Sequence, residues 1–214
     1  MPPSSSVNAT LRLFIEQHIL PQYAAFDKAH REPHVRQVIA QSLQLAAYYL
    51  VNVDMVYTIA AYHDLGLSAS RATHHLVSGH LVRHDARLAR WFTLADVEVM
   101  AQAVEDHRAS ADHEPRSIYG KIVAEADRQI DPDTLMRRCL QYGLKHHPTL
   151  ARNDQLQRAL HHLHDKYGEG GYLRLWLPES PNAARLQAFR QLLHDDEGML
   201  QALARIYEEE TAAH

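Results

Sequence analysis

The 214-residue sequence contains a single cysteine, Cys139, so it cannot form an intramolecular disulfide. One cysteine fits a reducing compartment. Long apolar runs are missing too, since the run at residues 45–51 is far shorter than the roughly 20 residues that a membrane-spanning helix needs. Residues 1–8 are rich in Pro and Ser, and no positively charged segment there precedes an apolar run, as it would in a signal peptide. We therefore expect a cytoplasmic protein with a disordered leader over residues 1–8.

Turn-forming residues and excess charge are also scarce. Eight glycines and nine prolines are few for a chain of this length, which argues against a turn-rich all-β sandwich. The formal net charge of −4 provides no general attraction to nucleic acids or anionic membranes. We therefore expect neither of these as a partner.

Apolar residues recur at helical spacing over most of the chain. Pro33 is suited to the first turn of a long helix. Residues 53–65 are nearly all apolar and lead into Gly66, as expected for a buried helix that ends at a glycine. Residues 172–177 alternate between apolar and polar side chains, which favours a short extended segment. We predict an all-α fold, with further helices over about 75–91, 95–108, 116–130, 149–167 and 182–209.

Two parts of the chain are expected to have different roles in the fold. We predict that residues 9–148 form the main helical core. Residues 149–214 should form a helical extension that packs on this core as part of one domain. The apolar residues of the last helix suit either the protein core or the interface of a homodimer, and both alternatives stay open.

Histidine is unusually abundant, with 17 among the 214 residues. It is the commonest metal ligand in proteins, and its unperturbed pKa lies near neutrality. Because the histidines are spread from His18 to His214, a purification tag does not explain them. Their number is consistent with metal binding, with pH sensing or with a solvated surface.

His63 and Asp64 stand at the end of the apolar stretch 53–65. Burial of an unpaired carboxylate is costly, so Asp64 requires a salt bridge, a hydrogen-bond network or a cation. His34 lies in the first turn of the preceding predicted helix, and Asp127 is flanked by apolar residues in another. Two imidazoles and two carboxylates make a mixed nitrogen and oxygen site suited to Mn, Fe, Co, Ni, Zn or Mg.

The order of these residues resembles the HD-domain superfamily of metal-dependent phosphohydrolases. The segment from Ala60 to Gly66, AAYHDLG, is similar to the family's AALLHDIG motif, and the segment from Ala124 to Arg128, AEADR, is similar to its DADRL motif. Residues 27–30, DKAH, precede the first histidine ligand as in the family's first-helix motif. The resemblance covers about residues 26–130, and it implies an HD-domain-like helical bundle with additional C-terminal helices.

The resemblance also implies a metal centre. Asp64 bridges to a second ion if one binds. In some members two intervening histidines hold the second ion, and the candidates here are His107 with His75 or His80. Alternatively, these histidines bind phosphate or are solvated. The residues implied to bind one divalent ion are His34, His63, Asp64 and Asp127.

The activity implied by the resemblance is hydrolysis of a phosphate ester or anhydride in a small molecule, most commonly a nucleotide. Asp64 and His107 are the candidate catalytic residues, and Lys121 and Arg128 are the candidates for offsetting phosphate charge. The family variant with a Gly-Tyr-Pro motif has no match here, which disfavours a cyclic-dinucleotide phosphodiesterase. Two alternatives stay open: an HD-type di-iron oxygenase, which needs six protein ligands, and a metal-binding regulatory module without turnover.

Overall fold

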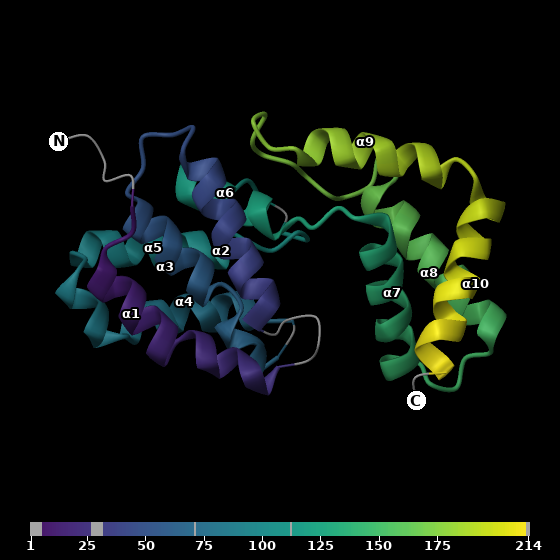
Figure 1. The fold of residues 1–214 in the computed structure, drawn as a ribbon, viewed down its shortest axis with the longest axis horizontal. Helices are drawn as coiled ribbons and strands as arrows, with labels where there is room; N and C mark the ends of the chain where they lie inside the picture. The colour runs from purple at the N-terminus through teal and green to yellow at the C-terminus, as the bar shows by residue number, and fades with distance from the viewer. Residues whose placement is uncertain (1–5, 27–31, 71, 112, 213–214) are drawn as a thin grey trace. The chain divides into compact units, whose positions relative to one another are not determined.

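The structure is a computed structural model of the chain. It describes residues 6–26, 32–70, 72–111 and 113–212. Within these ranges the chain forms α-helices and short 3₁₀ helices and no β-strand, which confirms the predicted all-α fold. No helix in the described part is both long enough and apolar enough to cross a membrane. The chain divides into two compact units (Figure 1): unit 1 comprises residues 1–128 and 176–180, and unit 2 comprises residues 129–175 and 181–214.

Unit 1 is organised around α3, whose residues from Met55 to Tyr62 are all buried. Helices α2, α5 and α6 pack against α3, and α4 packs against α5 and η3. The elements of unit 1 are α1 (Ala9–His18), η1 (Leu20–Ala25), α2 (Glu32–Ala46), α3 (Val53–Tyr62), η3 (Leu65–Ser68), α4 (His74–His84), η4 (Ala86–Arg90), α5 (Leu94–Glu105) and α6 (Ile118–Asp127).

The ends of α3 explain how the site is positioned. Its N-terminus is capped by Asn52, whose side chain accepts a hydrogen bond from the backbone N–H of Asp54 at 2.9 Å. The sequence predicted one helix up to Gly66, but α3 ends at Tyr62, and Gly66 lies inside η3. The change of helix type falls at His63 and Asp64, so both side chains project from a turn at the end of a buried helix.

Unit 2 contains α7 (Pro132–His146), α8 (Arg152–Tyr167), α9 (Asn182–Leu193) and α10 (Asp196–Ala212). Helices α7, α8 and α10 pack against one another, and α9 packs against α8 and α10. The single helix predicted over 182–209 is therefore two helices. The break has a local cause, because the Asp195 side chain accepts a hydrogen bond from the Gly198 N–H at 2.9 Å and thereby starts a new helix.

The structure bears on three expectations about the organisation of the chain. Residues 172–177, expected as a short extended segment, belong to no helix and to no strand, and α7, which lies in the part expected to form the main core, packs within unit 2. Of the predicted leader, residues 1–5 lie outside the described residues, whereas the Asn8 side chain caps α1. The packing of the C-terminal part on the core as one domain stays a prediction.

Candidate metal centre

The His63–Asp64 turn is held in place by a buried tyrosine. The Tyr23 hydroxyl donates to the Ala61 carbonyl at 2.9 Å and accepts a hydrogen bond from the Asp64 N–H at 3.3 Å. Tyr23 and His63 are completely buried, and Asp64 is 5% exposed. The turn therefore presents its imidazole and its carboxylate from a fixed backbone.

Backbone carbonyls set the proton positions of two imidazoles. Nδ1 of His63 lies 2.7 Å from the Ala60 carbonyl oxygen, and Nδ1 of His107 lies 2.6 Å from the Val104 carbonyl oxygen. Because a carbonyl only accepts, Nδ1 must carry the proton in both rings. The Nε2 atom of each neutral ring then offers a lone pair, which is the arrangement found in metal-binding histidines.

Asp64 is the common point of the site. Its Oδ2 lies 3.3 Å from Nε2 of His63 and 3.7 Å from Nε2 of His34. Its Oδ1 lies 3.4 Å from Nε2 of His74 and 3.4 Å from Nε2 of His107. The two oxygens of one carboxylate thus face two different pairs of histidines.

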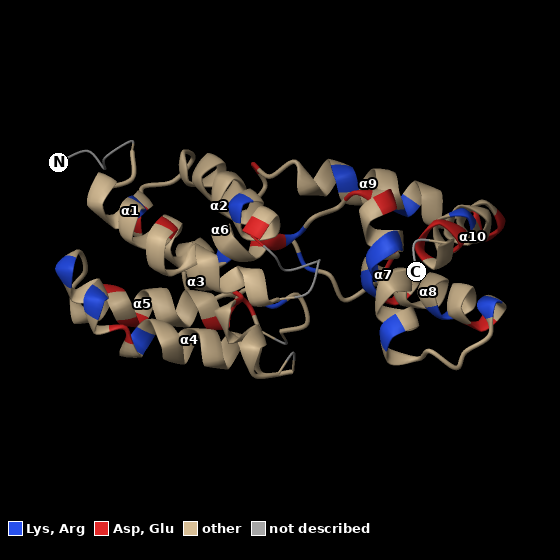
Figure 2. Cartoon of the chain, turned by 60° about the horizontal axis from the view of Figure 1, so that its bottom comes forward, with Lys and Arg blue, Asp and Glu red and all other residues tan. Residues whose placement is uncertain are grey.

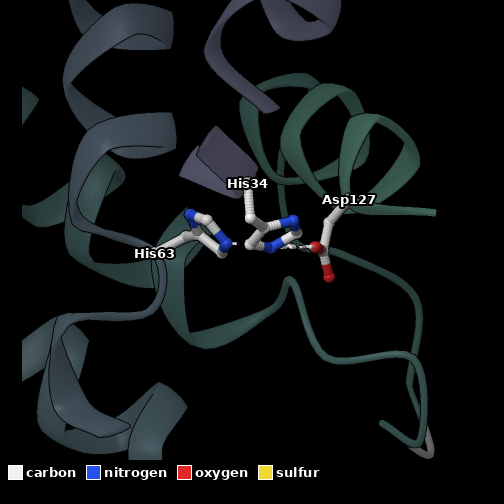
Figure 3. Close-up of side chains that lie close together, drawn as sticks. All are labelled: His34, His63 and Asp127. Atoms are coloured by element: carbon white, nitrogen blue, oxygen red, sulfur yellow. Dashed lines mark ion pairs between the residues drawn. The ribbon is translucent and has the colours of Figure 1, made fainter. Parts of the chain in front are cut away.

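Asp127 completes the first pair of histidines. Its Oδ1 lies 3.2 Å from Nε2 of His34 and 3.9 Å from Nε2 of His63, and Figure 3 shows the three side chains turned towards one another. We call His34, His63 and Asp127 the Asp127 group. The second set, Asp64, His74 and His107, is the Asp64 group. In each group the potential ligand atoms lie within 4.8 Å of one another, and we use the name metal centre for the two groups together, as a candidate site that could hold metal.

The charges of the centre are strongly coupled. Burial disfavours ionisation of Asp64, yet the charge of His63 and the hydrogen bond with His107 hold the pKa of that carboxyl well below its usual range. The pKa of Asp127 is likewise lowered against the effect of burial, chiefly by its hydrogen bond with His34. Burial also disfavours protonation of His63, but the two carboxylates outweigh it and raise the pKa of His63 to about 9. Both carboxylates are therefore anionic and attract a cation.

The residues fit a divalent cation. Nε2 of His63 is buried without a hydrogen-bond partner among the described residues. Nε2 of His74 and Nε2 of His107 face each other at 3.2 Å, so at most one proton fits between them. A buried nitrogen without a hydrogen bond is costly, and a bound ion would satisfy it. Imidazole nitrogens and carboxylate oxygens are ligands that divalent transition metals accept.

The structure brings together His34, His63, Asp64 and Asp127, and it places His107, the residue expected beside a second ion, next to Asp64. Residues 27–30 of the first-helix motif lie outside the described residues.

The second histidine of the Asp64 group is His74, and neither His75 nor His80 belongs to it. His75 is half-buried, and its ring contacts the ring of His74 at a centroid distance of 5.6 Å. His80 is exposed and stacks on His84, with ring centroids 3.8 Å apart. The buried residues His74 and Ser78 lie four apart on one face of α4, and this spacing is a signal by which His74 could have been found.

Gly66 allows the start of α4 to approach Asp64. A Cβ atom at this position would lie 2.0 Å from the His74 carbonyl oxygen and 2.8 Å from the Ser78 nitrogen. The Gly66 N–H donates to the Ser78 hydroxyl at 2.8 Å and fixes this close contact. A glycine is therefore required here by space.

The two cations expected to bind phosphate are engaged elsewhere. Arg128 is buried, and its Nη1 donates to the carbonyls of His107 and Ala124 at 2.9 and 2.7 Å. Lys121 forms an ion pair with Glu114. Arg128 thus links the backbone that follows α5 to the backbone of α6, and its bond to the His107 carbonyl helps to fix the position of that residue.

The comparisons with known proteins agree with this geometry. The family model of the HD domain matches residues 31–129, which contain all six residues of the metal centre. Comparisons with curated proteins and with solved structures gave no match. The helical fold and the His and Asp residues at the centre of the matched region agree with this match, and residues 31–129 are therefore assigned as an HD domain.

Proposed function

We propose that the protein is a metal-dependent phosphohydrolase that acts on a phosphate ester or anhydride, with nucleotides as the first substrates to test. The observation that carries the proposal is the position of Asp64 between two groups of metal-ligand residues. A carboxylate with one oxygen towards each group is suited to a site for two ions.

Each side chain has a defined task in this proposal. The Asp127 group would hold one divalent ion, and the Asp64 group would hold a second if one binds; Asp64 has one oxygen facing each pair of histidines. When bound there, divalent ions lower the pKa of a water molecule and polarise a phosphoryl oxygen. The Nδ1 atoms of His63 and His107 donate their protons to backbone carbonyls, so Nε2 is the atom that each ring would offer to an ion.

His107 is better suited to hold an ion than to transfer a proton. The sequence suggested it as a proton shuttle, but its Nδ1 proton is bonded to the Val104 carbonyl and its Nε2 faces Asp64. Asp64 remains the candidate catalytic residue because it is the one carboxylate that faces both groups. Asp127, with 24% of its side chain exposed, is the most accessible of the six candidate ligand side chains.

A second function is favoured by one observation. The centre supplies six protein ligands, His34, His63, Asp64, His74, His107 and Asp127, which is the number that the di-iron oxygenase alternative needs. Iron in both positions and oxygen consumption would distinguish this alternative from a hydrolase.

The experiment that tests the proposal starts from protein purified without a histidine tag. Its metals are identified, and phosphate release is then measured on a panel of nucleotides with Mn, Co, Ni, Zn, Mg and Fe, alongside oxygen uptake. We expect phosphate release with at least one ion, and loss of both metal and activity in His63→Ala. His80→Ala is the matched control, because it removes an exposed histidine outside the centre. No phosphate release from any nucleotide with any of these ions would favour a regulatory module, and oxygen uptake with two irons per chain would favour the oxygenase.

A further inference from the structure

The proposed reaction needs a cation other than the metal ions, because a phosphoryl group carries negative charge that arginine offsets well. Most basic side chains described in unit 1 already have partners, and Figure 2 shows blue and red segments side by side where α4 packs against α5. Arg12 and Arg90 lie over aromatic rings. The carboxylate pairs are Arg36 with Glu32, Arg83 with Glu98 and Glu105, Arg87 with Asp85, Arg116 with Glu105 and Asp106, and Lys121 with Glu114.

Arg108 is different. It directly follows the ligand His107 and is half-buried. Its Nη1 donates to the Ala72 carbonyl oxygen at 2.8 Å, and it forms no ion pair with any carboxylate in the described part of the chain. A guanidinium has five N–H donors, so one hydrogen bond to a carbonyl leaves most of them unused.

The position of this cation relates it to the Asp64 group. Arg108 is one residue beyond His107, and its partner Ala72 is two residues before His74. The guanidinium therefore joins the two segments that carry the histidines of this group. A planar fork of donors in this place suits two oxygens of one phosphoryl group.

His75 adds an unused polar atom in the same region. Its Nδ1 is buried and makes no hydrogen bond with the described residues. Its ring packs against the ring of His74, so it belongs to the immediate surroundings of the Asp64 group without being part of it. An imidazole nitrogen without a hydrogen bond to the described residues, near a guanidinium with unused N–H donors, is suited to an anion that both can bind.

We propose that Arg108, together with His75, binds the phosphoryl oxygens of the substrate beside the His74–His107 side of the metal centre. The inference rests on the proposed function and replaces Lys121 and Arg128 as the residues that offset substrate charge. Arg108 touches the substrate and holds it, and the ions and Asp64 act on the reacting atoms.

The test measures binding of inorganic phosphate by isothermal titration calorimetry to full-length protein loaded with Mn. Arg108→Gln keeps an N–H that can reach towards the Ala72 carbonyl but removes the charge, and Arg108→Lys keeps the charge but removes the fork. We expect about a ten- to hundredfold loss of phosphate affinity in Arg108→Gln, as for loss of a charge-assisted hydrogen bond, and a smaller loss in Arg108→Lys. Arg90→Ala, in η4 beyond the C-terminal end of α4, removes the same charge and should bind phosphate as the wild type does.

Metal content is measured on every variant, because it separates substrate binding from a structural role. The proposal is overturned if Arg108→Gln binds phosphate as tightly as the wild type, if it loses metal, or if the metal-loaded wild type does not bind phosphate. Failure of the proposed function looks different: the wild type then binds phosphate through Arg108 but hydrolyses no phosphate ester or anhydride. With a hydrolysed substrate, Arg108→Gln should raise KM more than it lowers kcat.

Discussion

The histidines of the metal centre contact carboxylates in the protein interior, whereas histidines of unit 2 contact carboxylates at the surface. In the centre, four buried imidazoles share Asp64 and Asp127. In unit 2, His161 faces Asp165 at 3.2 Å and His164 faces Asp196 at 2.8 Å, with all four side chains open to solvent. Water satisfies the surface pairs, whereas the buried nitrogens depend on one another or on an ion. Burial of histidine beside a carboxylate, more than the number of histidines, therefore marks the site.

The largest difference between the two regions should follow from removal of a carboxylate. Asp64→Ala is expected to lose bound metal and to reduce activity by about a thousandfold or more, because both groups meet at this side chain. Asp165→Ala, which breaks a surface pair in unit 2, should leave both unchanged. Metal content after dialysis and phosphate release measure the effect, and circular dichroism confirms that the helices remain. Wild-type metal content in Asp64→Ala would contradict the site.

Two glycines extend the comparison to the backbone. Gly66→Ala should destabilise the protein by about 1–3 kcal/mol, since the new Cβ collides with the backbone of α4, and it should weaken metal binding by shifting His74. Gly170→Ala in unit 2 has open space but a φ of +82°, so it should cost about 1–2 kcal/mol from backbone strain alone. Denaturant unfolding and metal titration of both variants check this. Equal metal affinities in the two variants would mean that Gly66 does not position the site.

The stability of the metal-free protein and the affinity for metal should both depend on pH. Because the pKa of His63 is raised from 6.5 to about 9, its proton stabilises the metal-free fold fully below pH 6.5, and this stabilisation is lost as the pH rises to about 9. An ion must displace that proton from Nε2, so metal affinity should rise by about tenfold per pH unit over the same window. Competition with a chelating dye between pH 6.5 and 9 measures it. An affinity independent of pH would contradict ligation by His63.

The smallest effect is expected at a surface pair. His164→Ala removes the contact with Asp196 on unit 2 and should change the free energy of unfolding by less than about 0.5 kcal/mol. Metal content and activity should equal those of the wild type. A loss of metal in this variant would show that histidines outside the centre contribute ligands.

The sequence singled out His34, His63, Asp64 and Asp127 because each is a polar residue in an apolar helix or at its end, and the structure places these four side chains close together. Their role as ligands stays a prediction. The sequence did not identify His74, because the spacing of His74, His75 and His80 does not say which of them faces the interior; that depends on where α4 begins. Arg128 was misjudged for a similar reason, since its side chain folds back onto the carbonyls of His107 and Ala124. Proximity in sequence to a ligand says little about the direction of a long side chain.

The sequence predicted the all-α fold class, but it was less reliable for the positions at which helices end. Helical periodicity continues through residues 182–209, and only the cap made by Asp195 on Gly198 divides α9 from α10. At the end of α3, the apolar pattern runs past the point where the helix stops, because residues after His63 stay buried in a 3₁₀ turn. Burial and helix type are separate properties, and the apolar pattern reports only the first.

The central claim is that Asp64 is shared by two metal ions. Anomalous diffraction from crystals of the Mn-loaded protein tests it most directly. We expect two anomalous peaks, one among His34, His63 and Asp127 and one between His74 and His107, with an oxygen of Asp64 beside each. A single peak remote from Asp64, or none at the centre of a protein that carries bound Mn, would contradict it.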